Sequence, residues 1–142
     1  MAQSEVELGA GYLVKRVQQA LRRRSDAALR PTGLSMAQYA ALRALADHPE
    51  ASASELARLC FVTRQSLHDL LAGLKSDGLI RASASRGRAT ALALTPAGRR
   101  RLAASHHAVL AVEEAMVDGL ASGARRQLTA LLTRCAENLE AR

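Results

Sequence analysis

The stretch "ASASELARLCFVTRQSLHDLLAGLKSDGLI", residues 51–80, contains start and stop signals for two consecutive helices. Ser52 and Glu55 have the spacing of a capping box, which predicts a first helix of about two turns. Thr63 is placed to cap the second helix through its hydroxyl, and Gly78 favours the left-handed residue that ends it. The stretch therefore predicts two short helices joined by a tight connection.

The second of these helices has two dissimilar faces. One face carries leucines, and the other begins with polar side chains: Leu67, Leu70, Leu71 and Leu74 against Arg64, Gln65, Ser66, His68 and Asp69. Arginine can donate two parallel hydrogen bonds to guanine, and glutamine can pair with adenine, while Thr63 and Ser66 suit a phosphate or a base. This pattern is typical of a helix-turn-helix, whose second helix enters the DNA major groove. A solvated amphipathic helix is the alternative interpretation.

A short two-stranded element is predicted next. The runs "LIRAS" (79–83) and "ATALALT" (89–95) are extended in pattern, and the second alternates with period two. Gly87 lies between Arg86 and Arg88 at the tip of the predicted hairpin. A helix-turn-helix followed by such a hairpin is a winged helix, and arginine is attracted into a narrow minor groove. Ordinary surface charge is the alternative for these arginines.

Long helices flank this central region. Helical apolar spacing covers residues 5–29, 96–120 and 123–140, and "SMAQYAALRALADH" (35–48) opens with a capping box of Ser35 and Gln38. Thr95 and Pro96 suit the cap and the first turn of the helix that follows the hairpin. The predicted fold is mainly α with a small β-hairpin wing. Because packing within one chain leaves an apolar stripe in water, we expect a two-fold dimer.

Composition and charge favour a protein that binds a polyanion and argue against a membrane protein. The chain has 142 residues, a net charge of +7 and a sequence pI near 10.7, which favours a polyanion partner such as nucleic acid. No apolar run approaches the roughly 18 residues of a membrane span, and the N-terminal residues do not resemble a secretory signal. We expect a cytoplasmic protein with no membrane partner.

Residues 55–98 resemble the winged helix-turn-helix core of the multiple antibiotic resistance regulator (MarR) family. The similarity lies in "ELA", "VTRQS", "GLI" and "LTPAG" in this order and spacing, and the flanking helices extend it over nearly the whole chain. The resemblance implies a single domain, 1–142, with a winged DNA-binding region at 35–95 and dimerisation helices at 5–30 and 96–142. It also implies a homodimeric transcription regulator, usually a repressor, that binds a pseudo-palindromic operator in double-stranded DNA.

The resemblance also assigns residues. The recognition helix receives Thr63, Arg64, Gln65, Ser66 and His68, and the wing receives Arg86 and Arg88. Ser52 and Ser54 open the preceding helix, where side chains or amides can contact phosphate. Many family members carry an Asp-Arg pair in a longer wing, and the Arg86-Gly87-Arg88 sequence departs from that pattern. Which arginine enters the minor groove is therefore open.

Other ligands and chemistries are weaker hypotheses. We interpret Cys60 and Cys135 as buried structural thiols rather than a redox sensor, which requires a partly exposed thiolate. His106 and His107 diverge by about 100° on a helix, so we expect no metal site, and His106 suits a hydrogen-bonded core histidine. No nucleotide-binding or hydrolase motif predicts an enzyme or a cofactor. A nonspecific architectural DNA-binding protein and a partner-binding helical module are the remaining alternatives.

An effector is expected only from the resemblance. Family members are often released from DNA by a small molecule, which would bind where the dimer helices meet the winged region. The Leu, Ala and Val composition favours a small hydrophobic or amphipathic molecule. The sequence does not identify its binding residues.

Overall fold

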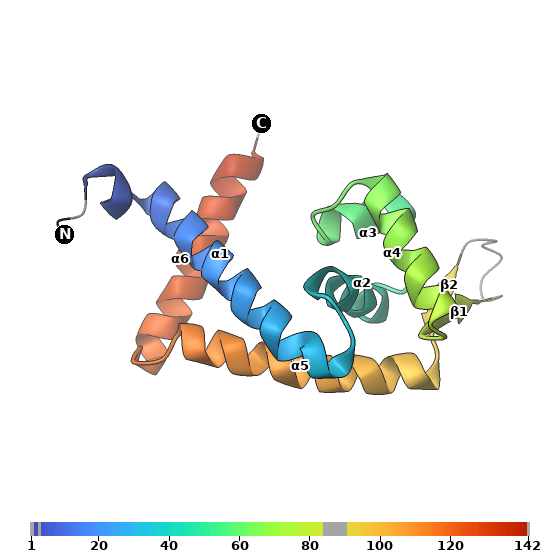
Figure 1. Cartoon of the computed structure of the whole chain (residues 1–142). Coiled ribbons are helices and arrows are strands. Elements are labelled where there is room, and N and C mark those ends of the chain that lie inside the picture. Colours follow the sequence, from blue (N-terminus) through green and yellow to red (C-terminus); the bar gives the residue numbers. More distant parts are fainter. Residues whose placement is uncertain (1, 3, 84–90, 142) are drawn as a thin grey trace. The chain divides into compact units, whose positions relative to one another are not determined.

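The computed structural model of the chain describes residue 2 and residues 4–83 and 91–141. The elements follow in the order η1 (Val6–Leu8), α1 (Ala10–Leu29), η2 (Arg30–Thr32), α2 (Met36–Asp47), α3 (Ala53–Leu59), α4 (Arg64–Ser76), β1 (Ile80–Ala82), β2 (Leu92–Leu94), α5 (Pro96–Met116) and α6 (Ser122–Glu140). Figure 1 shows the helices and the hairpin in these positions along the chain. The predicted fold class, mainly helical with one small antiparallel hairpin, is confirmed. The chain forms two compact units, Met1–Val112 and Glu113–Arg142.

Side-chain caps start the helices of the central region. Ser35 and Gln38 form both bonds of a capping box at α2, and Ser52 and Glu55 do the same at α3. Thr63 accepts a hydrogen bond from the backbone N–H of Ser66 at 3.0 Å, which caps α4. These caps satisfy amides that have no partner within their helices. The three predicted helix starts are therefore confirmed.

Glycine sets several helix boundaries. Gly78 ends α4 with a φ of 74°, as predicted. The first helix starts at Ala10 rather than near residue 5, because Gly9 is extended with ψ 148° and separates α1 from η1. Similarly, α5 ends at Met116 rather than near residue 120, and Gly119 follows with a φ of 84°. At these positions glycine takes an extended or left-handed backbone outside the helix, which its freedom of φ and ψ permits.

The core of the first unit lies between the winged elements and the helices that flank them. α2 contacts α1, α3, α4 and β2, and α4 also contacts α3 and β1. The fully buried leucines come from α1, α2, α4 and the residue before β1: Leu29, Leu42, Leu67, Leu74 and Leu79. Leu102 and Val109 of α5 join the same cluster. Burial of these side chains fixes the orientation of α4, since Leu67 and Leu74 allow only its opposite face to meet solvent.

The base of the wing is tied to the start of α5. β1 and β2 pair antiparallel with Ile80 opposite Leu94 and Ala82 opposite Leu92. Thr95 donates its backbone N–H to Leu79 O at 3.0 Å and its hydroxyl to Gly78 O at 2.6 Å. The Thr95 hydroxyl oxygen also accepts from Gly98 N at 3.0 Å, which confirms it as the cap of α5. The hairpin is therefore fixed to two helices, although its tip lies outside the described residues.

Large apolar side chains remain exposed on the helices that flank the winged region. In α1 they are Tyr12, Leu13, Val14 and Val17, and in α6 they are Leu131, Leu132 and Leu139. α6 has no buried residue. Among the described residues, no helix combines the length and the apolar character needed to span a membrane.

Candidate nucleic-acid interface

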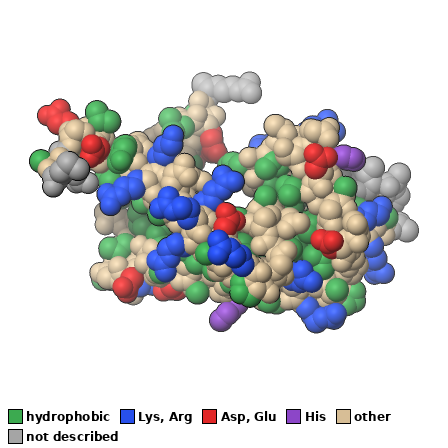
Figure 2. Space-filling view, viewed as in Figure 1, with side chains coloured by type: hydrophobic (Ala, Val, Ile, Leu, Met, Phe, Trp, Pro, Cys, Tyr) green, Lys and Arg blue, Asp and Glu red, His purple; other side chains and the backbone are tan. Residues whose placement is uncertain are grey.

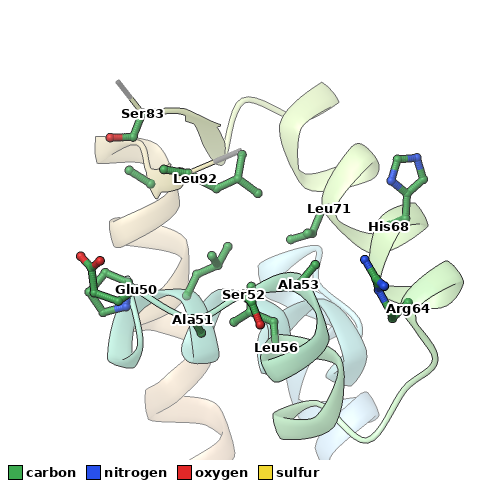
Figure 3. Close-up of a pocket in the computed structure, with 14 residues that line it drawn as sticks. Glu50, Ala51, Ser52, Ala53, Leu56, Arg64, His68, Leu71, Ser83 and Leu92 are labelled. Carbon is green, nitrogen blue, oxygen red and sulfur yellow. The ribbon is translucent and has the colours of Figure 1, made fainter. Parts of the chain in front are cut away.

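The polar start of α4 lies at the surface. Thr63, Arg64, Gln65, Ser66 and His68 are all exposed, whereas Leu67 is 1% exposed. Figure 3 shows Arg64 and His68 on the same side of α4, one turn apart. The structure thus brings together the five residues predicted on this helix, and leucines hold the helix from behind.

Local hydrogen bonds restrict what these side chains can offer. The Thr63 hydroxyl donates to Ser66 Oγ at 3.0 Å, so the proton of the Ser66 hydroxyl is the one directed elsewhere. Gln65 donates from Nε2 to Asp69 Oδ1 at 3.2 Å. Asp69 therefore holds the Gln65 amide, a contact that the sequence pattern did not single out although its i,i+4 spacing permits it.

The start of α3 offers fewer free hydroxyl groups for a phosphate contact than its sequence suggests. Ser52 is half-buried, and its hydroxyl accepts from Glu55 N at 3.2 Å as the helix cap. Ser54 is exposed on the first turn. The backbone amides at this helix start remain the more direct donors for an anion.

The wing adds basic charge at the edge of this surface. Arg86 and Arg88, the predicted wing residues, lie outside the described residues. Arg81 of β1 is exposed and was not singled out from the sequence. Figure 2 shows Lys and Arg side chains beside the hairpin and gathered over α1, which carries Lys15, Arg16, Arg22, Arg23 and Arg24.

A cleft of about 770 Å³ lies between the α2–α3 connection, the start of α3, α4 and the two strands. Leu56, Leu71 and Leu92 supply apolar lining, and Figure 3 shows Leu71 directed toward the cavity. Arg64 and His68 line its α4 side. One cavity thus combines apolar side chains with groups that can bind a carboxylate, and it lies within the first compact unit.

The cysteines and histidines are placed as follows. Cys60 is half-buried rather than buried: it packs against the core, and this partial burial raises the pKa of its thiol above the ordinary value. The prediction that Cys135 is buried is wrong for the single chain, because α6 exposes it. The Nδ1 atom of His106 lies 2.8 Å from the Tyr39 hydroxyl oxygen, which confirms the predicted hydrogen bond, although the imidazole is half-buried rather than in the core. No group of three or more His, Cys, Asp or Glu in the described part of the chain is arranged to hold a metal ion.

Known proteins share this architecture. The MarR family profile matches residues 32–89. The HTH-type transcriptional repressor Rv2887 of Mycobacterium tuberculosis is 39% identical over 109 residues, which is 75% of this chain and 78% of the relative. A crystal structure of Rv2887 with p-aminosalicylic acid is 31% identical, with a TM-score of 0.76 over 90% of this chain and 98% of that one. A structure of the same protein with DNA has a TM-score of 0.73 and 29% identity over 94% of this chain and 98% of that one.

These similarities agree with the capped helix pair, the hairpin and the exposed polar start of α4. The sequence alignment with Rv2887 covers most of both chains, at an identity that establishes common ancestry. The fold of the Rv2887 crystal structure matches that of this chain over nine-tenths of its length. The chain belongs to the MarR family of winged helix-turn-helix transcription regulators.

Proposed function

We propose that this protein is a homodimeric repressor that binds a pseudo-palindromic operator in double-stranded DNA. The observation that carries the proposal is the α4 surface: a helix backed by buried leucines whose exposed first turns present Arg64, Gln65 and His68. Two such helices, related by a dimer axis, would enter major grooves about one helical turn apart. The relative Rv2887 is named a transcriptional repressor and has a structure with DNA, which supports the proposal.

Each group on the surface receives a role. Arg64 would donate two hydrogen bonds to a guanine, and Gln65 would pair with an adenine. Thr63, Ser66 and His68 would contact a base or a neighbouring phosphate, and the amides around Ser52 and Ser54 would bind phosphate. Arg86 and Arg88 of the wing would supply charge to the minor groove. Base contacts would set the sequence preference, while the phosphate contacts set the salt dependence.

The dimer would use the two ends of the chain. In this proposal residues 35–95 bind DNA, and residues 5–30 and 96–142 form the dimerisation region of a single domain. The exposed apolar side chains of α1 and α6 support this division, because contiguous exposed apolar side chains usually mark an interaction site. Sedimentation at micromolar concentration would give the mass of two chains, and a monomer would contradict the division.

Small-molecule release is proposed from the cleft beside α4, which is a different place from the junction of the dimer helices and the winged region that the resemblance implied. A carboxylate at Arg64 and His68, with its apolar part against Leu56 and Leu71, would occupy the groups that DNA needs. Rv2887 has been crystallised with p-aminosalicylic acid, which is a molecule of this chemical class. Salicylate should therefore raise the operator Kd, whereas neutral salicylamide should not. Equal effects of the two compounds would contradict a carboxylate site.

The role would be regulatory rather than catalytic, exercised in the cytoplasm where the chromosome is accessible. Selection of the protein against a random duplex pool tests the whole proposal. We expect a palindromic winner that binds about 10³-fold or more tightly than a scrambled duplex. Equal and steeply salt-dependent binding to both duplexes would instead favour an architectural DNA-binding protein. Absence of binding to either would refute a DNA-binding role.

A further inference from the structure

Phe61, in the connection between α3 and α4, has an unusual combination of backbone and exposure. Its φ is 56°, and its side chain is 93% exposed. Among the described residues, every other position with a positive φ is a glycine: Gly33, Gly78 and Gly119. A bulky residue in the left-handed region is a true outlier, because its Cβ crowds the backbone there.

The conformation of Phe61 is required by the way that α3 ends. Phe61 N donates to Arg58 O at 3.2 Å, and Val62 N donates to Ala57 O at 3.0 Å. These two bonds define a Schellman motif, in which the residue after the helix cap must be left-handed. The motif seats Val62 against the core and leaves Phe61 outside.

The end of α4 provides an internal comparison. Gly78 N donates to Lys75 O and Leu79 N donates to Leu74 O, both at 3.0 Å, so the same motif is formed with glycine at the left-handed position. Phenylalanine at that position lowers the folding equilibrium constant by a factor of about 5 to 30 relative to an unstrained residue. Burial of the ring does not offset this loss, since Phe61 is almost fully in water.

The position of Phe61 suggests a function that would explain why this loss of stability is tolerated. Phe61 precedes Thr63, the cap of α4, by two residues, and therefore lies at the entrance to the proposed recognition helix. Residues with a strained backbone cluster at functional sites, so the observed φ of Phe61 supports a functional hypothesis. In the major groove, the apolar group that phenylalanine can contact is the C5-methyl of thymine.

We propose that Phe61 is a specificity-determining residue that contacts one thymine methyl in each half-site of the operator. The inference rests on the proposed DNA-binding function and adds a base contact to it. In this proposal the Phe61 ring contacts DNA and no other partner. A second copy of the chain covering Phe61 is the competing outcome, which the stability measurement below separates.

Stability without DNA is measured first, at fixed protein concentration. Phe61→Gly should raise Tm by about 2–5 °C, because it removes the strain and loses no buried contact. Gly78→Ala is the matched control: a Cβ there meets no atom within 4 Å, so its strain is conformational alone, and Tm should fall by a similar amount. A lower Tm for Phe61→Gly would mean that another part of the protein or a second copy covers the ring, and would overturn the proposal.

DNA binding is measured next, with the duplex selected by the wild-type protein. Phe61→Gly should weaken operator binding about 5- to 30-fold and change binding to a scrambled duplex less than about twofold, whereas Phe61→Leu should retain most of the affinity. Replacement of thymines by uracil, one position per half-site at a time, should weaken wild-type binding about threefold or more at one position. The same replacement should have no effect on Phe61→Gly.

The outcomes distinguish this inference from the proposed function. Operator binding by Phe61→Gly at wild-type strength, or a uracil effect that persists in that variant, would refute the thymine contact alone. Failure of the wild-type protein to prefer any duplex would refute both.

Discussion

Replacement of Gly98 by alanine tests how the wing is attached to α5. A Cβ at Gly98 would lie 2.0 Å from the carbonyl oxygen of Leu79, where real contacts are at least 3.0 Å. The obstacle is backbone rather than a flexible side chain, so either the start of α5 or the end of α4 must move by about 1 Å. That movement disturbs the hydrogen bond from Thr95 N to the same Leu79 oxygen.

The magnitude follows from three contributions. Loss of the Thr95–Leu79 hydrogen bond destabilises by about 1–3 kcal/mol when the oxygen is left without a partner. Displacement of the buried side chains around Leu79 and Leu102 adds about 1–3 kcal/mol. Alanine recovers about 1 kcal/mol through its higher helix propensity. The net destabilisation is about 1–5 kcal/mol, which corresponds to a fall in Tm of roughly 3–18 °C for a chain of this size.

Thermal melting followed by circular dichroism, at one protein concentration, measures the effect. Gly73→Ala is the matched control, because Gly73 lies inside α4 and a Cβ there meets no atom within 4 Å. The control should raise Tm by about 2–4 °C through helix propensity alone. A Gly98→Ala protein that melts within 2 °C of wild type would refute the contact between α5 and Leu79.

Three further predictions concern the α4 surface and the thiols. Arg64→Ala should cost about 1–3 kcal/mol of operator binding and relax the preference at one position per half-site, as measured by selection with the variant; unchanged affinity and preference would disprove its base contact. Asp69→Ala should release the Gln65 amide and remove a negative charge, so scrambled-duplex binding should tighten about threefold to tenfold in a filter assay; no change would argue against its proximity to DNA. At pH 7, iodoacetamide should modify Cys60 of the native protein more slowly than Cys60 of the urea-unfolded protein, because the raised pKa keeps the thiol protonated until the pH rises further; equal rates in mass spectrometry of digests would disprove this.

Local features were predictable because their determinants lie within one helical turn. The capping boxes of Ser35 and Ser52 and the cap of Thr63 each use side-chain and backbone groups three residues apart. The left-handed residue that follows α4 was predictable because glycine, here Gly78, favours that conformation. The leucine face of α4 was visible as a period, and the core confirms it by burying Leu67 and Leu74.

The candidate site was predictable only in part. The five polar residues of α4 were found because their spacing and chemistry are local. The hydrogen bond between Gln65 and Asp69 depends on the rotamers of the two side chains. The left-handed backbone of Phe61 depends on how α3 ends against the core. The i,i+4 spacing of Gln65 and Asp69 permits their contact without requiring it, and phenylalanine is disfavoured at a left-handed position.

The sequence by itself determined the order of helices and hairpin, their caps and the face of α4 that carries the polar groups, because periodicity and capping act over a few residues. Only the tertiary structure decided the contacts between distant segments. The Tyr39–His106 hydrogen bond spans 67 residues, and the approach of Gly98 to Leu79 brings two backbones together. It also showed that Cys135, placed on an apolar stripe by its spacing, is exposed in the single chain. Helical spacing identifies an apolar face, but burial depends on which surface packs against that face.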